Sequence, residues 1–451
     1  MKALLGALAK EGMLSIVVLI VLVALTWMGG EYLEWDVKLR VLIIIGLLAV
    51  FLIMYVAQNV LSVRRAMTIE NQLRAQAQMH VQSTIPDKQP EIQALEQQFQ
   101  EALAALKNSG LGKDALYRLP WYPIIGPPGA GKSTALQESG LNFPSMGTGP
   151  KAIRGIGGTR NCDWWFTDEG ILLDTAGRYT TELDDQQEWF SFLDLLKKSR
   201  PSKPINGAIV AISIADLVSA TDSQIEEYAS TIRDRLDELC KRLQLVFPVY
   251  LMFTKCDLLQ GFSEFFEDFS KADRAQAWGT SFKYSGNPGK TYSELFLDEC
   301  AALTANLRNR RVGALGTERP VKKRQAVYLF PLQFEMAQKK LAEFIGHLFK
   351  PNPFQESPIL RGFYFTSGTQ KGTPVDQVVA AMSKAFGVEA PVEQAEEAVI
   401  ERKSFFLKDL FTKIIFPDQH LAQPTAGVRK KLRLLRLASV AASLAFLALC
   451  T

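Results

Sequence analysis

The chain has 451 residues, a length that corresponds to roughly two to three globular units of ~100–200 residues each. It carries 51 Lys and Arg against 47 Asp and Glu, a net charge of +4, so a nucleic-acid partner is not expected. Hydrophobic residues make up 47% and charged residues 22%, which excludes a wholly disordered chain. Five scattered cysteines without CxxC spacing favour a reducing compartment over a disulfide framework or a zinc site.

Three apolar stretches predict membrane segments. Residues 12–30 and 41–63 are free of charge and long enough to span a bilayer, so residues 1–63 are predicted to form a transmembrane helix hairpin. A cleaved signal peptide is the alternative for the first stretch, but no small-residue cleavage site follows it. Residues 437–451 are interpreted as the start of a third membrane helix, with a short C-terminal anchor as the alternative.

The distribution of basic residues predicts the orientation of these segments. Arg64 and Arg65 follow the second stretch, and a cluster of five Lys and Arg lies between residues 429 and 436. Since positive charges stay on the cytoplasmic side, residues 64–436 are expected in the cytoplasm of a multi-pass protein of the bacterial inner membrane. The same basic cluster is compatible with binding to anionic lipid.

The cytoplasmic region divides by pattern. Residues 64–118 are predicted to form an amphipathic helical linker, and from residue 119 short apolar runs alternate with helical stretches. The alternation predicts an α/β fold: a P-loop GTPase-like, mostly parallel sheet over 119–258, a helical insertion over 259–358, a last strand and helix over 359–385, and a helical extension over 386–436. Strands are expected at 121–125, 162–167, 170–174, 207–214, 248–254 and 362–366, the second and third of them paired as an antiparallel hairpin.

Two further stretches, one apolar and one basic, each allow two interpretations. Apolar residues of the extension are expected to pack into the core, with a partner site as the alternative; they are Phe405, Phe406, Leu410, Phe411, Ile414 and Ile415. A basic stretch from Arg308 to Arg324 is interpreted as a solvated loop, with an acidic partner or a lipid surface as the alternative.

A phosphate-binding loop (Walker A) follows the first expected strand. The string GPPGAGKS matches G-x-x-x-x-G-K-[ST] and precedes a helical stretch, the context in which backbone N–H groups wrap a phosphate. Lys132 is expected to bridge the β- and γ-phosphates, and the Ser133 hydroxyl to bind Mg²⁺. The expected nucleotide contacts in this loop are those of Gly126, Gly129, Gly131, Lys132, Ser133 and Thr134.

The string DTAG ends the third expected strand. Its position places the Asp174 carboxylate beside the phosphate loop, where it can hold the Mg²⁺ shell, and Gly177 can offer its N–H to a γ-phosphate. Thr159 lies between the two motifs and could complete the Mg²⁺ shell as a switch-loop threonine does. Arg178 stands where Ras-type GTPases carry a water-orienting Gln; it cannot act as a base, although it could stabilise charge in a transition state.

The string TKCD follows the strand at 248–254 and matches the [NT]KxD pattern of GTPases. In that pattern Asp257 accepts hydrogen bonds from guanine and the stem of Lys255 packs on the base; a chance tetrapeptide is the alternative. Ser367, after the last strand, could line the same base pocket. The sequence thus predicts a nucleotide site that also uses Mg²⁺, and leaves ATP and GTP both open.

Several strings together resemble the TssM (IcmF-like) inner-membrane proteins of bacterial type VI secretion systems: LPWYPIIGPPGAGKST, GGTRNCDWWFTDEGILLDTAGRY, VYLMFTKCDLL, RGFYFTSGTQKG and SFFLKDLFTKIIFP. The resemblance covers essentially the whole chain. It implies a homo-oligomeric core component of a secretion membrane complex, in contact with a second inner-membrane protein (TssL-like), cytoplasmic baseplate components and, through a periplasmic domain absent from these 451 residues, an outer-membrane lipoprotein (TssJ-like).

Two functions remain in competition at this point. One is a structural scaffold in which bound nucleotide acts as a ligand or conformational switch, favoured by the anchored architecture and by Arg178. The other is an ATP- or GTP-hydrolysing motor that energises assembly or firing, favoured by the intact phosphate loop, with Lys132, Asp174, Thr159 and Arg178 as its catalytic residues. An ABC-type ATPase is excluded because no LSGGQ-like string is present.

Overall fold

The computed structural model describes residues 115–143, 162–180, 186–283, 289–316, 319–352, 358–368 and 403–430, with single residues at 26–28, 32, 35–38, 44, 46, 97 and 356. The chain separates into two compact units, Met1–Thr84 and Ile85–Thr451, and the strands and helices below belong to the second. The expected membrane segments fall almost entirely outside the described residues. Within the described residues, no helix combines the length and the apolar character that crossing a bilayer requires.

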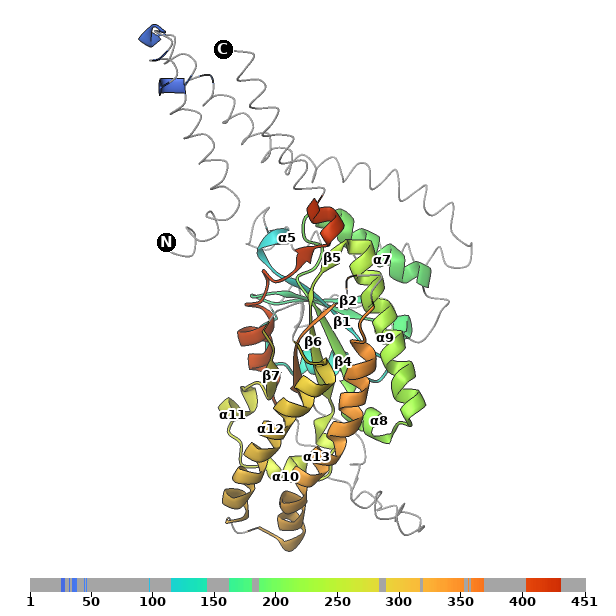
Figure 1. Ribbon diagram of the computed structural model, residues 1–451. Helices are drawn as coiled ribbons and strands as arrows, with labels where there is room; N and C mark the ends of the chain where they lie inside the picture. The colour runs from blue at the N-terminus through green and yellow to red at the C-terminus, as the bar shows by residue number, and fades with distance from the viewer. Residues whose placement is uncertain are drawn as a thin grey trace. The chain divides into compact units, whose positions relative to one another are not determined.

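A seven-stranded sheet forms the centre of the second unit, in the order β2-β3-β1-β4-β6-β8-β7 (Figure 1). Neighbouring strands from β3 to β8 run parallel, and β2 and β7 add antiparallel edges. The strands are β1 (Trp121–Ile125), β2 (Cys162–Phe166), β3 (Ile171–Thr175), β4 (Ala208–Ser213), β6 (Pro248–Thr254), β7 (Gly279–Ser281) and β8 (Ile359–Phe365). The six predicted strands and the antiparallel hairpin are confirmed, with ends shifted by a few residues; β7 was not predicted from the sequence.

Helices cover both faces of this sheet. They are α5 (Ala115–Arg118), α6 (Lys132–Gln137), α7 (Gln186–Ser199), α8 (Ile214–Ser219), α9 (Asp222–Leu243), α10 (Phe262–Phe265), α11 (Lys271–Ala275), α12 (Tyr292–Leu315) and α13 (Val321–Leu348). Short 3₁₀ turns begin within two of the motifs, η2 (Gly177–Thr180) in DTAG and η4 (Cys256–Leu258) in TKCD. A π-helix, η5 (Leu410–Ile415), lies near the C-terminal end of the described chain.

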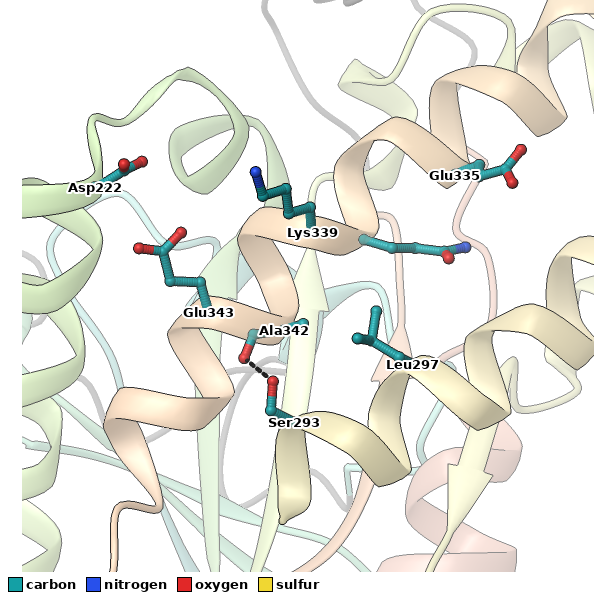
Figure 2. A pocket seen from close by; sticks show the side chains of 8 residues that line it. Asp222, Ser293, Leu297, Glu335, Lys339, Ala342 and Glu343 are labelled. Atoms are coloured by element: carbon teal, nitrogen blue, oxygen red, sulfur yellow. Dashed lines mark hydrogen bonds between the residues drawn. The ribbon is translucent and has the colours of Figure 1, made fainter. Parts of the chain in front are cut away.

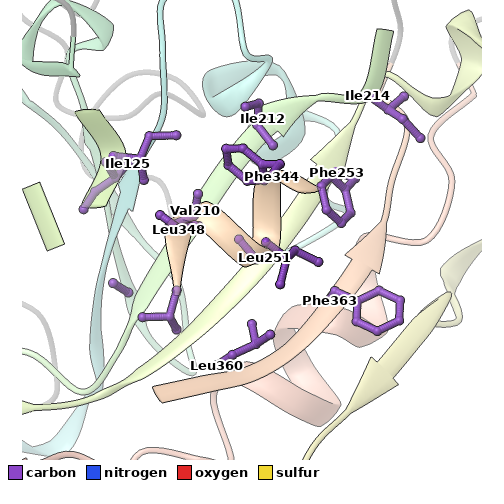
Figure 3. Close-up of a cluster of buried hydrophobic side chains, with 14 of the residues drawn as sticks. Ile125, Val210, Ile212, Ile214, Leu251, Phe253, Phe344, Leu348, Leu360 and Phe363 are labelled. Atoms are coloured by element: carbon purple, nitrogen blue, oxygen red, sulfur yellow. The ribbon is translucent and has the colours of Figure 1, made fainter. Parts of the chain in front are cut away.

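Alternate residues of the central strands pack into two separate cores. On β4, Val210 and Ile212 join the larger core with α7, α9 and α13, whereas Ile209 and Ala211 join the smaller core with α6 and η5. Figure 3 shows the larger core, where Val210 and Leu251 lie beside Phe344 and Leu348 of α13. Burial on both faces explains why these strands read as continuous apolar runs.

Residues 403–424, here called the C-terminal strap, cover the second face. Leu410, Phe411, Ile415 and Phe416 are buried in the smaller core against β1, β3, β4 and β6. Tyr122 on β1 donates a 2.6 Å hydrogen bond to the Ile415 carbonyl. The strap ends in β9 (Gln423–Pro424), which pairs with β5 (Leu245–Val246) in a two-stranded sheet. The prediction that this apolar stretch packs into the core is confirmed.

Most of the basic stretch is helical, so its interpretation as a loop is wrong, although several of its side chains are exposed as expected. Its basic residues lie in the second half of α12, at the start of α13 and, for Arg319, between the two helices, and several form ion pairs within the domain. Arg308 pairs with Glu335 at 2.5 Å, Lys323 pairs with Glu267 at 2.6 Å, and Arg319 pairs with Asp268 near α10. The first ion pair links α12 to the middle of α13, and the other two link the start of α13 and the residues before it to the segment after α10.

Candidate nucleotide site

The candidate site lies at the carboxyl edge of the parallel strands, where β1, β3, β6 and β8 all end. The phosphate loop leaves β1 at Gly126 and enters α6 at Lys132. A Cβ at Gly126 would lie 2.0 Å from the Ala211 carbonyl oxygen on β4, so only glycine lets the loop start this close to the neighbouring strand. Gly129 and Gly131 adopt positive φ values of 75° and 78°.

Lys132 folds back into this loop. Its Nζ donates to the carbonyl oxygens of Gly126 at 2.7 Å and Pro127 at 3.1 Å, and its side chain is buried. Burial lowers the pKa of Lys132 to about 8, although the charge of Asp174 acts in the opposite direction. A phosphate with two or more negative charges would compete with these carbonyls for the ammonium group.

The serine of the loop and the aspartate of DTAG meet directly. Ser133 Oγ donates to Asp174 Oδ2 at 2.5 Å, and Asp174 is fully buried on β3. Thr175 Oγ1 donates to the Ile124 carbonyl at 2.7 Å, which fixes β3 against β1 next to the loop. Hydroxyl and carboxylate oxygens are the ligands that Mg²⁺ prefers. Within the described residues, no group of three or more His, Cys, Asp or Glu is placed to bind a metal.

Gly177 lies against the backbone of the phosphate loop at Pro128. A Cβ at Gly177 would lie 2.6 Å from the backbone N and Cα of Pro128. The DTAG glycine therefore lies beside the loop, and its contact with a γ-phosphate stays a prediction. Thr159, the expected switch threonine, lies outside the described residues.

Arg178 is held by a helix on the larger core. Its Nη2 forms a 2.7 Å ion pair with Glu188 of α7, whose side chain is 1% exposed, and its guanidinium carbon lies 5.5 Å from the ring centre of Tyr179. Using Arg178 on a phosphate would require it to leave a buried carboxylate, which is energetically unfavourable. The structure thus joins Arg178 to α7, a contact that the sequence did not reveal.

The TKCD motif contacts both the phosphate loop and the end of β8. Thr254 Oγ1 donates to the Ala130 carbonyl at 2.6 Å, and Lys255 adopts a left-handed backbone conformation with φ of 58°. The Ser367 hydroxyl donates to the Asp257 carboxylate. Burial raises the pKa of Asp257, while the hydrogen bond from Ser367 acts to lower it. Asp257 and Ser367 are 110 residues apart in the sequence, and this hydrogen bond brings them together at the same part of the site.

The opening of the C-terminal strap also reaches this site, which the sequence did not predict. Ser367 and Phe405 exchange backbone hydrogen bonds of 3.1 and 2.8 Å as an isolated antiparallel bridge. Gly368 approaches α6, because a Cβ there would lie 3.0 Å from Thr134 Cγ2. The apolar pattern of the strap indicated burial, but nothing in the pattern indicated pairing with β8.

A separate hollow of about 610 Å³ lies at the helical layer (Figure 2). Lys339 and Glu343 of α13, Asp222 of α9 and Leu297 of α12 line it. No residue of the phosphate loop, DTAG or TKCD lines this hollow, so it is distinct from the nucleotide site.

The sequence profile of the IcmF-related N-terminal domain matches residues 182–443, more than half of the chain. The chain belongs to the IcmF-related family. It is 44% identical over 364 residues to the Type VI secretion system component TssM1 of Pseudomonas aeruginosa, an alignment that covers 78% of this chain and 33% of that protein. The chain thus spans about a third of the length of this relative.

Two solved structures share a smaller part of the chain. A complex of the signal recognition particle receptor, SRb-GTP/SRX, from Chaetomium thermophilum is 23% identical and covers 31% of this chain and 70% of that chain, with a TM-score of 0.20. A mutation variant of SsGBP is 17% identical and covers 36% of this chain and 47% of that chain, with a TM-score of 0.18. At these scores the family assignment rests on the sequence match alone.

Proposed function

We propose that this chain is an inner-membrane scaffold of a type VI secretion membrane complex, whose cytoplasmic α/β domain binds ATP or GTP with Mg²⁺ as a structural or switch element. The single observation that carries the nucleotide part is the 2.5 Å hydrogen bond between Ser133 Oγ and Asp174 Oδ2 beside the glycine-rich loop. Family membership and the name of the 44% identical relative support the secretion part.

In this proposal each motif has one task. Lys132 exchanges its two carbonyl partners for the β- and γ-phosphates, and Ser133 and Asp174 hold Mg²⁺ directly or through water. Gly177 lies against the loop at Pro128, and its N–H is proposed to contact the γ-phosphate when nucleotide binds. Thr159 is proposed as a second sensor. Order in these two segments would change the surface that the domain offers to cytoplasmic partners.

Asp257, Lys255 and Ser367 are proposed to form the base side of the pocket. Thr254 links this side to the phosphate loop through the Ala130 carbonyl. A carboxylate at Asp257 suits guanine, whose ring N–H and amino group both donate hydrogen bonds. Adenine, which lacks that pair of donors, would use Asp257 less well, so this position decides between GTP and ATP.

The second candidate is a hydrolysing motor. The observation in its favour is that Lys132, Ser133 and Asp174 all occupy the carboxyl edge together. Against rapid turnover stands Arg178, which replaces a water-orienting residue and is bound to Glu188. The scaffold therefore remains our first proposal, with slow hydrolysis compatible with it.

Anchoring and partners complete the proposal. Residues 12–30, 41–63 and 437–451 are proposed to lie in the inner membrane with residues 64–436 in the cytoplasm. A TssL-like inner-membrane protein, cytoplasmic baseplate components, further copies of the chain and, through a periplasmic domain, a TssJ-like lipoprotein are the proposed partners. Anchoring predicts that alkaline extraction of bacterial membranes leaves the full chain in the pellet; release into the supernatant would contradict it.

The decisive experiment is equilibrium binding of labelled ATP and GTP to the detergent-solubilised full chain, with Mg²⁺ or with EDTA. Lys132→Ala should abolish binding, whereas the matched control Lys322→Ala, at an exposed position on α13, should retain it. A GTP preference that disappears in Asp257→Ala would support a guanine switch. ATP binding with turnover lost in Lys132→Ala would support the motor. Absence of binding to both nucleotides would refute the nucleotide role and leave a scaffold alone.

A further inference from the structure

The first and last described segments of the domain both lie at the edge of the sheet opposite the nucleotide site. Because β1, β3, β4, β6 and β8 are parallel, they all begin at this amino edge. The guanidinium carbon of Arg200, after α7, lies 5.4 Å from the ring centre of Tyr117 and 4.9 Å from that of Trp121 at the start of β1. Figure 1 shows α5, the end of α7, β5 and the last described helical turn on the same end of the domain.

The outgoing chain is fastened to this same edge. Lys203 Nζ donates to the Gln419 carbonyl in the strap, and Thr425 N donates to the Gln244 carbonyl at 3.0 Å. Lys197 at the end of α7 donates to the Arg242 carbonyl at 2.7 Å. The segments around residues 118, 200, 242 and 425 are therefore neighbours in space.

Basic side chains dominate the surface formed by these segments. We call it the amino-edge face and define it by six residues: Arg118, Lys197, Lys198, Lys203, Arg429 and Lys430. Arg118, Arg429 and Lys430 are exposed, and the three lysines are partly exposed. All six lie on the segments that the contacts above bring together.

Most carboxylates near this face are already engaged. Asp194 binds Arg242 through two hydrogen bonds of 2.7 and 2.8 Å, and Asp418 binds Arg361 at 2.7 Å. Glu356 accepts a hydrogen bond from the Ala426 N–H at 2.5 Å. Among the described residues of this edge, Asp168 and Glu169 are exposed; they lie in the β2–β3 turn, where Asp168 accepts a hydrogen bond from Asn142. Over the part of the chain that the structure describes, the basic side chains of this face therefore outnumber its carboxylates.

A buried cation adds to this charge. Arg200 is 1% exposed, and its guanidinium donates a hydrogen bond to the Asn206 amide oxygen at 3.2 Å. Burial, and after it the charge of Arg200, lower the pKa of Lys203 to about 8. The Arg200 guanidinium is thus a second positive charge close to Lys203.

The chain length beyond the face indicates which anion is near. Lys430 is followed by six residues before Leu437, where the third predicted membrane stretch begins. A connection of this length reaches about 10 Å as a helix and about 24 Å when fully extended. Bilayer head groups would thus lie within a few Debye lengths, each about 8–10 Å at physiological salt.

We propose that the amino-edge face binds the anionic phospholipid head groups of the inner membrane and turns the nucleotide edge toward the cytoplasm. The proposal rests on the membrane anchoring in "Proposed function", and it is independent of nucleotide binding. Clusters of Lys and Arg next to a membrane segment are attracted to anionic lipid, and here two of the six come from α7, remote in sequence from all three predicted membrane stretches.

The test places the full chain in nanodiscs of phosphatidylcholine alone or with about a third phosphatidylglycerol, and measures amide hydrogen exchange. We expect segments 196–206 and 425–430 to exchange at least about threefold more slowly in the anionic nanodiscs, and the phosphate loop 126–133 to be unchanged. High salt should remove the difference, because exposed charges are screened.

Two matched charge reversals identify the face. Lys198→Glu with Arg429→Glu should abolish the protection, whereas Lys322→Glu with Arg324→Glu, exposed at the start of α13, should preserve it. Equal exchange in both lipid compositions, or equal loss in both double variants, would overturn the proposal. If a DNA oligonucleotide added to neutral nanodiscs gave equal protection, the face would bind polyanions in general, and the proposal of a lipid partner would be overturned.

The outcomes also separate this proposal from the anchoring. Retention of the chain in neutral nanodiscs without lipid-dependent protection would leave the anchoring intact and overturn the face. The chain could instead be retained only in anionic nanodiscs, with retention lost in the double variant that includes Lys198→Glu. That result would support lipid binding by the amino-edge face and contradict the membrane anchoring. Retention in neither would overturn both.

Discussion

Ser133 Oγ lies 2.5 Å from Asp174 Oδ2, so the last residue of the glycine-rich motif and the first residue of DTAG, 41 positions apart, form one hydrogen bond. Parallel pairing of β1 with β3 places them there, because adjacent parallel strands end at the same edge. The bond gives the proposed magnesium site a geometric basis that neither motif has alone.

Asp174→Asn should separate the structural from the functional role of this pair. The amide oxygen can still accept a hydrogen bond from Ser133, but it lacks the negative charge that attracts Mg²⁺. We expect the Mg²⁺-dependent part of nucleotide affinity to fall by at least about tenfold, with unfolding free energy changed by less than about 2 kcal/mol. Titration calorimetry and chemical denaturation measure the two quantities. Asp168→Asn, at an exposed turn, is the control and should change neither.

Gly177→Ala should loosen the contact between DTAG and the phosphate loop. Its Cβ would lie 2.6 Å from the Pro128 backbone, which cannot move aside as a flexible side chain can. We expect a loss of about 1–3 kcal/mol in unfolding free energy, together with weaker nucleotide binding. The matched control is Gly313→Ala in α12, where nothing lies within 4 Å of the new Cβ. That change should stabilise the protein by up to about 1 kcal/mol, so equal losses would argue against the contact.

Tyr122→Phe tests how the strap is attached. The change removes the 2.6 Å hydrogen bond to the Ile415 carbonyl and leaves that buried oxygen without this donor. The expected loss of unfolding free energy is about 1–3 kcal/mol. Hydrogen exchange should accelerate in the strap before it does in β4. Tyr328→Phe, on the exposed side of α13, should leave stability and exchange unchanged. A neutral effect of Tyr122→Phe would show that apolar packing alone holds the strap.

The stability of the domain should rise between pH 8 and pH 10.5 through Lys132. Its pKa is lowered to about 8 in the folded protein from 10.5, so in this interval the unfolded chain binds more protons than the folded one. Burial of the charged amine therefore disfavours folding below pH 8, and the penalty is relieved as the pH rises through the folded pKa.

Lys132→Met isolates this effect. Relative to wild type, the variant should be more stable at pH 7 by up to about 3 kcal/mol, and that advantage should shrink by pH 10. Urea denaturation at the two pH values gives both differences. Lys322→Met is the control; because that side chain is exposed, its difference from wild type should be the same at both values. A constant advantage for Lys132→Met would contradict the lowered pKa.

The sequence by itself determined the strands and the motifs of the candidate site. Strands such as Pro248–Thr254 are buried on both faces, so they appear as unbroken apolar runs, and each motif follows the end of such a run. The glycines at 126 and 177 are needed because the backbone comes close to other segments there, and the sequence shows them at the fixed positions that glycine has in the two motifs. The base specificity, the switch threonine Thr159 and the membrane helices stay predictions.

Tertiary structure decided the contacts between distant segments. The ion pair of Arg178 with Glu188, the hydrogen bond of Ser367 with Asp257 and the bridge of Ser367 with Phe405 have no periodic pattern. The short strand β7, Gly279–Ser281, has little apolar character, and it joins the sheet only because β8 offers it a free edge. Backbone pairing and buried ion pairs depend on which segments the fold brings together, and local residue order does not contain that information.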